Sequence, residues 1–173
     1  MPQSLRFLLC ALCLGLPAFG CGPHTPAPRS EVALGHAACR SGMYAKAGEQ
    51  AVGGIQAAIA WVNEVHGGVK LGEERYPLRY KLYDCESRRE QVTSLLERLI
   101  TVDRVDALMA PYSSGLTLGA SPLAEKYGML LLNHGGASDE IYQQGFLYNV
   151  QTIGPGTRYH KATPEKLKRE AGE

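Results

Sequence analysis

The chain has 173 residues, a length that suits one domain or one lobe of a larger protein. Apolar residues make up 45% and charged residues 20%, which are ordinary proportions for a globular domain. The formal net charge is +1, and the Lys and Arg residues are scattered among acidic ones, so the sequence predicts no nucleic-acid partner.

The first twenty residues have the pattern of an export signal. Arg6 is followed by an apolar run over residues 7–16 and then by the small residues Ala18 and Gly20. The run is too short to cross a bilayer. Residues 1–20 are therefore predicted to be a signal peptide.

Cys21, which comes directly after this signal, resembles the lipidated cysteine of a bacterial lipobox, although Ala18 stands where that motif usually has Leu. Ordinary secretion and a retained anchor are the alternatives. Residues 21–30 are rich in Pro and poor in apolar residues, which is typical of a tether. We therefore expect a protein of the periplasm or cell envelope that is lipid-anchored to the membrane.

Strands and helices alternate through the rest of the chain. Strands are predicted at residues 31–37, 76–86, 105–111, 129–133 and 146–150, and helices at residues 46–68, 88–103 and 115–128. A loop and a short helix start follow at 134–140, and the polar tail is expected to be either a solvated helix from Pro164 onward or disordered. Gly53 and Gly54 lie inside the first helix and destabilise it, and we expect close packing of this helix on a sheet to compensate for that cost. Pro122 is expected to lie in or near a break of the third helix.

This alternation indicates an α/β fold with a doubly wound parallel sheet, for which the strand order 2-1-3-4-5 is expected. Ligands of such sheets bind beyond the carboxyl ends of the strands where the strand order reverses, here between the first and third strands. The loops at that point are residues 38–45 and 110–115. Ser113 and Ser114 are therefore expected in the crevice, and a plain polar turn that caps a helix is the alternative.

Several motifs occur in order along this part of the chain. They are GMYAKAGEQAVGGIQAAIAWVNEVHGGV, YDCES, LLERLITVDRVDALMAPYSSGLTLGASPLAEKYG and GGASDEIYQQGF. Together they resemble the first lobe of the type I periplasmic binding proteins, specifically the leucine/isoleucine/valine-binding receptors of ABC transporters. The resemblance covers residues 31–159, which are predicted to form this N-terminal lobe, and residues 160–173 are assigned to the polar tail.

The resemblance implies a two-lobed Venus flytrap that binds a small amino acid or related polar ligand, serves an ABC transporter permease, needs no cofactor and is not an enzyme. The ligand-binding residues that it implies are Ser113, Ser114, Gly135, Gly136, Ala137 and Ser138. Ala137 stands where leucine-binding members carry Thr, so the hydroxyl for the ammonium contact is lost at this position, and Ser138 is the alternative hydroxyl. Because the family continues into a second lobe, we expect a fragment, a truncated gene product or a single-lobe derivative.

Other readings of the same residues are weaker. A ligand-sensing ectodomain of a signalling receptor would use the same clamshell, and a single-lobe interaction protein would need no small ligand. A catalytic triad of Ser114, His134 and Asp139 is disfavoured, because no G-x-S-x-G elbow follows a strand. No metal site is expected either, because the Cys and His spacings match no zinc pattern.

Two cysteines remain outside the signal and the lipobox. Cys39 follows the first predicted strand and Cys85 ends the second, so both are expected beyond the same carboxyl edge of the sheet. Disulfides persist in exported proteins, and neighbouring strands lie close enough for one. We expect a Cys39–Cys85 disulfide, and two independent buried thiols are the alternative.

Overall fold

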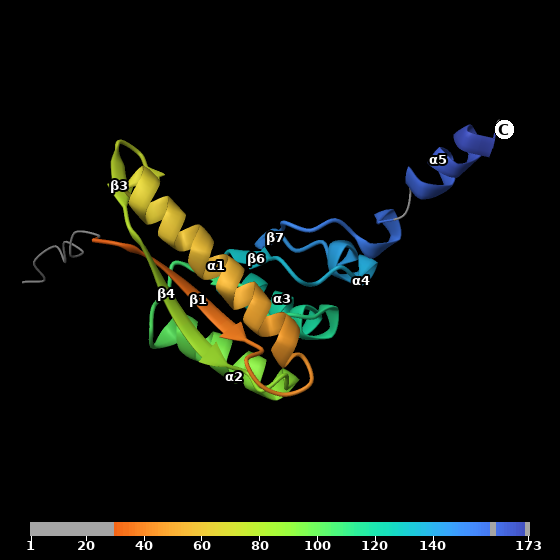
Figure 1. Ribbon diagram of the computed structural model, residues 1–173. Coiled ribbons are helices and arrows are strands. Elements are labelled where there is room, and N and C mark those ends of the chain that lie inside the picture. Colours follow the sequence, from red (N-terminus) through yellow and green to blue (C-terminus); the bar gives the residue numbers. More distant parts are fainter. Residues whose placement is uncertain (1–29, 160–161, 172–173) are drawn as a thin grey trace, which may run out of the picture.

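The computed structural model describes residues 30–159 and 162–171 of the chain. These residues form an α/β lobe in which one parallel sheet lies between helices (Figure 1). The predicted signal peptide and the lipidation site at Cys21 lie outside the described residues, as do residues 21–29 of the predicted tether.

The main sheet has five strands in the order β4-β1-β5-β6-β7, and every pair of neighbours is parallel. The strands are β1 (Val32–Ala38), β4 (Leu78–Asp84), β5 (Ala107–Met109), β6 (Leu131–Asn133) and β7 (Asn149–Gln151). In the order of the predicted strands this is 2-1-3-4-5, so the predicted topology is confirmed.

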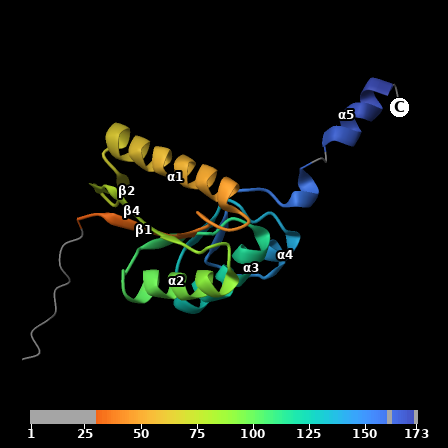
Figure 2. The ribbon, with the colours of Figure 1, turned by 60° about the horizontal axis from the view of Figure 1, so that its bottom comes forward.

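Helices cover both faces of this sheet (Figure 2). The helix α1 (Ala45–His66) packs on β1 and β4, whereas α2 (Arg89–Thr101) and α3 (Ser114–Tyr127) pack together on the opposite face. The short α4 (Asp139–Gln143) lies beside α3. The bounds of the predicted helices and strands agree with these elements to within a few residues.

The main core lies between the sheet and the α2–α3 layer. On α2, the residues Val92, Leu96 and Leu99 recur at helical spacing and are fully buried. They meet the buried side chains of Leu108 and Leu131 from the central strands. Burial of each such side chain contributes roughly 1.5–3 kcal/mol, so this layer holds α2 and α3 on the sheet.

Two expectations about glycine and proline were wrong. Gly53 and Gly54 are exposed, and a β-carbon at either would meet nothing within 4 Å, so they do not serve close packing. The close approach of α1 is made instead at Gly48, whose β-carbon would lie 1.8 Å from the Cys39 oxygen. The helix α3 also runs through Pro122 without a break, because the exposed proline lies where water can replace its missing N–H donor.

The sequence analysis also missed a small antiparallel hairpin between α1 and β4. It consists of β2 (Val69–Leu71) and β3 (Glu74–Tyr76), which pair over three residues each. The two strands are too short to show an alternating pattern of their own, which is why the periodicity did not reveal them.

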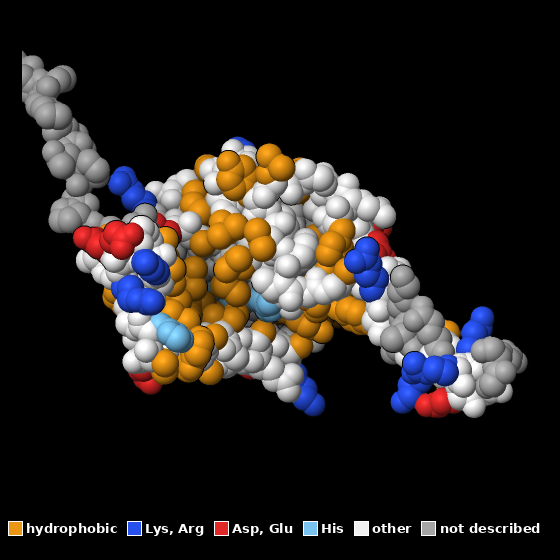
Figure 3. Space-filling view, turned by 90° about the horizontal axis from the view of Figure 1, so that it is seen from above, with side chains coloured by type: hydrophobic (Ala, Val, Ile, Leu, Met, Phe, Trp, Pro, Cys, Tyr) orange, Lys and Arg blue, Asp and Glu red, His pale blue; other side chains and the backbone are white. Residues whose placement is uncertain are grey.

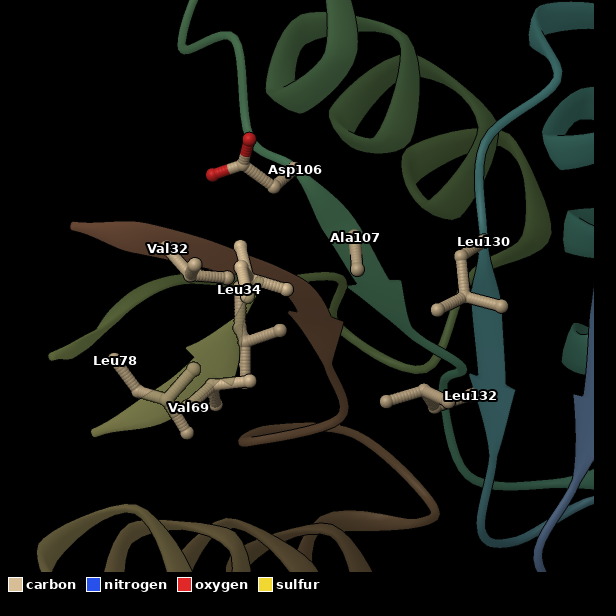
Figure 4. Close-up of a pocket in the computed structure, with 9 residues that line it drawn as sticks. Val32, Leu34, Val69, Leu78, Asp106, Ala107, Leu130 and Leu132 are labelled. Carbon is tan, nitrogen blue, oxygen red and sulfur yellow. The ribbon is translucent and has the colours of Figure 1, made fainter. Parts of the chain in front are cut away.

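One part of the sheet has an open apolar face. On the α1 side, α1 packs over β1 and β4, and a hollow of about 440 Å³ lies beside it. Figure 3 shows hydrophobic side chains gathered around this hollow. Leu34, Ala107 and Leu132, from three neighbouring strands, point toward the same space, while the Asp106 carboxylate points away from it (Figure 4).

The chain after β7 is largely exposed. A short 3-10 helix, η1 (Gly156–Arg158), is followed after the undescribed residues 160–161 by α5 (Ala162–Ala171). The predicted solvated helix of the tail is therefore present. Within the described ranges, no helix has the length and the apolar composition of a membrane span.

Candidate functional site

The candidate site lies at the carboxyl ends of β1 and β5, where the strand order reverses. Two loops meet there, one between β1 and α1 and the other between β5 and α3. The rings of Tyr44 and Tyr112, one from each loop, contact each other edge to face with centroids 5.8 Å apart. The two loops that the fold argument selected are therefore side by side.

Asp84 and Ser87 hold the first of these loops in shape. The Asp84 Oδ1 accepts hydrogen bonds from the backbone N–H groups of Arg40, Ser41 and Glu86 at 2.9–3.2 Å. The Ser87 hydroxyl donates to the Ser41 carbonyl at 2.6 Å and accepts from the Tyr44 N–H at 3.1 Å. Short polar side chains that bind nearby backbone groups in this way rigidify a turn.

Ser114 joins the two loops for which ligand contacts were predicted. Its hydroxyl oxygen accepts hydrogen bonds from the backbone N–H groups of Ala137 and Ser138, both at 3.1 Å. Ser114 is the first residue of α3, so its position is set by the start of that helix. Because the oxygen acts as acceptor twice, the hydroxyl hydrogen of Ser114 is left to donate to another group.

Ser113, the residue before α3, has a buried hydroxyl with no hydrogen-bond partner among the described residues. Its backbone is extended, and its side chain does not cap the helix. The alternative, a serine whose side chain caps the helix, is therefore not what the structure shows for Ser113. A buried hydroxyl without a partner costs free energy, so a bound polar group at this position would be stabilising.

Asn133, a residue that the sequence analysis missed, builds the loop after β6. Its side chain is fully buried, and its Oδ1 accepts from the N–H groups of Gly135 at 3.2 Å and Gly136 at 2.8 Å. Its Nδ2 donates to the Gly136 carbonyl at 2.8 Å. An Asn at the end of an apolar strand and directly before a Gly-rich turn is the signal that could have revealed it.

The two glycines allow this loop to approach the loop that carries the serines. A β-carbon at Gly135 would lie 3.0 Å from the Tyr112 ring, and one at Gly136 would lie 2.8 Å from the Thr117 side chain. The Ala137 carbonyl accepts from the Gly156 N–H at 2.7 Å, so the segment after β7 supports the loop from the other side. The structure thus brings together Ser113, Ser114 and residues 135–138, and their contact with a ligand remains a prediction.

Two histidines lie on the α1 side of the sheet behind this site. His36 is 1% exposed, its Nδ1 lies 2.6 Å from the Tyr80 hydroxyl, and its ring contacts that of His134 edge to face. Burial, together with the neighbouring His134, lowers the pKa of His36 from 6.5 to about 3, and burial also lowers the pKa of His134. Both imidazoles are therefore neutral at pH 7.

The two cysteines behind the site meet as predicted from the strand order. The Cys39 and Cys85 sulfurs are 3.3 Å apart as free thiols, and both side chains are fully buried. A disulfide between them remains a prediction. Among the described residues, no three His, Cys, Asp or Glu side chains gather in a way that could hold a metal ion.

Residues 31–170 match a protein family described as periplasmic binding protein. Among curated proteins, the Leu/Ile/Val-binding protein homolog 8 of Brucella abortus is 32% identical over 112 residues, which are 65% of this chain and 26% of that protein. The Leu/Ile/Val-binding protein homolog 7 of Brucella melitensis is 31% identical over 118 residues, 68% of this chain and 28% of that protein. The chain thus spans little more than a quarter of these relatives.

Solved structures show the same fold. A branched-chain amino acid transporter substrate-binding protein from Streptococcus pneumoniae, solved with isoleucine, superposes with a TM-score of 0.69 at 22% identity, covering 83% of this chain and 39% of its own. A solute-binding protein of an ABC transporter from Rhodopseudomonas palustris was solved with 3,4-dihydroxybenzoic acid. It superposes with a TM-score of 0.61 at 22% identity, and the match covers 72% of this chain and 32% of that protein's chain. These superpositions show the fold, and the family match over residues 31–170 confirms the resemblance that the motifs indicated.

Proposed function

Because the chain belongs to the periplasmic binding protein family, we propose that its lobe forms one wall of a binding site for the carboxylate of a small ligand. The proposed ligand is a free amino acid of the branched-chain type. The proposed role of the protein is that of the extracytoplasmic solute-binding component of an ABC transporter. The relatives that support this proposal are longer chains, of which this chain covers 26% and 28%.

The arrangement of the two serines is the observation that carries the proposal. The Ser114 oxygen is occupied by two backbone N–H donors, which leaves its hydrogen to donate, and the Ser113 hydroxyl is buried without a partner among the described residues. Both hydroxyls lie where α3 begins. The first N–H groups of a helix have no acceptor within the helix, and they carry partial positive charge. Hydroxyl and N–H donors at such a point bind a carboxylate without any Lys or Arg.

The described lobe favours recognition of a carboxylate over recognition of an ammonium group. Ala137 has no hydroxyl that could accept from an ammonium group, and one of the two lone pairs of its carbonyl already accepts from the Gly156 N–H. Two of the structural relatives were solved with isoleucine and with 3,4-dihydroxybenzoic acid, which share a carboxylate and differ in the rest of the molecule. The carboxylate is therefore the group that these two ligands have in common.

Titration followed by backbone amide NMR tests this proposal, since it detects weak binding to one wall. The probes are leucine, 4-methylpentanoate, which lacks the amine, leucinamide, which lacks the carboxylate, and benzoate. We expect leucine and 4-methylpentanoate to shift the amides of Ser113, Ser114 and residues 135–138, and leucinamide to leave them unchanged.

The matched control is Ser94→Ala, an exposed serine on α2, against Ser113→Ala at the site. We expect Ser113→Ala to weaken the binding of leucine and of 4-methylpentanoate at least about 5-fold, in line with the loss of one hydrogen bond to a charged group. Equal shifts from leucinamide, or shifts with none of the probes, would contradict the proposal. The second result would favour a single-lobe interaction protein without a small ligand.

The place of the protein in the cell is also part of the proposal. We expect export through the signal at residues 1–20, lipidation of Cys21 and function at the membrane beside a permease. Labelling cells with radioactive palmitate should mark the wild-type protein and not a Cys21→Ala variant. Genes for permeases next to its own would favour transport, and their absence would favour the ectodomain of a signalling receptor.

A further inference from the structure

Cys39 and Cys85 occupy matching positions at the ends of two neighbouring parallel strands. The last residue pair of β1 and β4 is Ala38 with Asp84, and the Cys85 N–H donates to the Ala38 carbonyl at 2.8 Å just beyond it. Neighbouring strands lie about 4.8 Å apart, which falls within the Cα separation of about 4.4–6.8 Å that disulfides use. The two sulfurs already face each other at 3.3 Å, so a bond needs a closure of about 1.3 Å.

The Cys39 thiol also reaches the loop that carries the two serines. Its Sγ donates a hydrogen bond to the backbone carbonyl of Tyr112 at 2.9 Å. A thiol has a single hydrogen, so this bond exists only while Cys39 is reduced. The Tyr112 residue comes directly before Ser113, and its ring packs on Tyr44. The oxidation state of Cys39 is thus coupled to the position of the loop that carries Ser113 and Ser114.

We propose that Cys39 and Cys85 form an intramolecular disulfide, and that its formation releases the Tyr112 carbonyl and loosens the loop of Ser113 and Ser114. The bond itself is independent of any ligand, whereas its consequence for binding rests on the proposed function. A partly buried carbonyl that loses its donor is less stable in its position, so the loop shifts or gains mobility when the thiols are oxidised.

The chemistry requires an oxidant of the disulfide class, such as glutathione disulfide or a disulfide-bearing oxidoreductase. One cysteine, as thiolate, attacks a sulfur of the oxidant, forms a mixed disulfide and expels one thiolate. The second cysteine then attacks the mixed disulfide, and the new Cys39–Cys85 bond expels the remaining half of the oxidant. Two S–H bonds are lost from the protein, and two electrons and two protons pass to the oxidant, which leaves as two thiols. Because both side chains are fully buried, we expect this exchange during folding or local opening.

The first test detects the bond. The full chain carrying Cys10→Ser, Cys13→Ser and Cys21→Ser is refolded in buffers of reduced and oxidised glutathione, and free thiols are alkylated before peptide mass mapping. In the oxidising buffer we expect one linked peptide pair that contains Cys39 and Cys85 and that separates on reduction. The bond closes a long loop, since the two residues are 46 apart in sequence, so the thermal midpoint should rise by roughly 10 °C. Alkylation of both thiols in every buffer would overturn the proposal.

The second test reads the loop by amide hydrogen exchange over residues 113–117. In the reduced chain and in a Cys39→Ser variant, a hydrogen-bond donor to Tyr112 is kept, and slow exchange is expected. In the oxidised chain and in Cys39→Ala the donor is lost, and exchange should be at least about 3-fold faster. Amides of α2 serve as the internal control and should be unaffected. Equal exchange of residues 113–117 in the oxidised and reduced chains would refute the coupling to the loop.

Discussion

Gly48 lies against the backbone carbonyl of Cys39 so closely that a β-carbon at position 48 would come within 1.8 Å of the carbonyl oxygen. This contact sets how near α1 can approach the end of β1. It also fixes α1 against the end of β1, where the loop between β1 and α1 at the candidate site begins.

The substitution Gly48→Ala is therefore expected to destabilise the fold by about 3 kcal/mol, since α1 must be pushed off the strand. Gly54→Ala in the same helix is the matched control. Its β-carbon would meet nothing within 4 Å, and alanine is the better helix former, so a gain of about 0.5–1 kcal/mol is expected. The free energy of unfolding in urea measures both. Changes of the same sign in both variants would show that the contact is unimportant.

Ser114→Ala removes the acceptor that holds the N–H groups of Ala137 and Ser138. Loss of a partner for two partly buried donors should lower the free energy of unfolding by about 1–3 kcal/mol. The exposed Ser94→Ala on α2 should change it by less than about 0.5 kcal/mol. Urea unfolding compares the two, and a loss no larger for Ser114→Ala than for Ser94→Ala would mean that the hydroxyl does not join the loops.

Stability is expected to fall as the pH drops below 6.5, because of His36. Burial lowers the pKa of His36 from 6.5 to about 3, so between these values the unfolded chain binds a proton that the folded chain does not. The contribution of His36 to the free energy of unfolding is therefore fully present above pH 6.5. It is lost as the pH falls toward 3, at up to roughly 1.4 kcal/mol per pH unit. The lowered pKa of His134 acts in the same direction.

Thermal unfolding between pH 7 and pH 4 measures this dependence in the wild type and in two variants. His36→Gln should flatten the decline, while Ser94→Ala, at an exposed position of α2 that carries no titratable group, should leave it unchanged. A decline as steep in His36→Gln as in the wild type would assign the acid sensitivity to other groups.

The apolar hollow beside α1 should bind an apolar fluorescent dye such as anilinonaphthalene sulfonate. Leu130, 38% exposed, lines this hollow together with Leu34 and Leu132, so Leu130→Glu should reduce the dye signal at least about 2-fold with little loss of stability. Leu167→Glu on α5 replaces an equally large exposed side chain outside the hollow and should have no effect. An equal reduction in both variants would place the dye elsewhere.

Much of the fold could be predicted from the sequence because it depends on local patterns. The spacing of Val92, Leu96 and Leu99 encodes the buried stripe of α2, and the alternation of helices and strands encodes the parallel sheet. Once the strand order is known, the carboxyl ends of β1 and β5 locate the loops of Ser113 and Ser114. These features follow from the periodicity of each element and from the handedness of its connections.

Other features were decided only by the tertiary structure, because they depend on residues far apart in sequence. The partners of Ser114 are 23 and 24 residues away, and the oxygen that Gly48 approaches belongs to another element. Likewise, no local pattern distinguishes Gly48, which is packed, from Gly54, which is open. An element's own sequence determines which of its faces is apolar, whereas the contacts that each face receives are determined by the packing of the whole lobe.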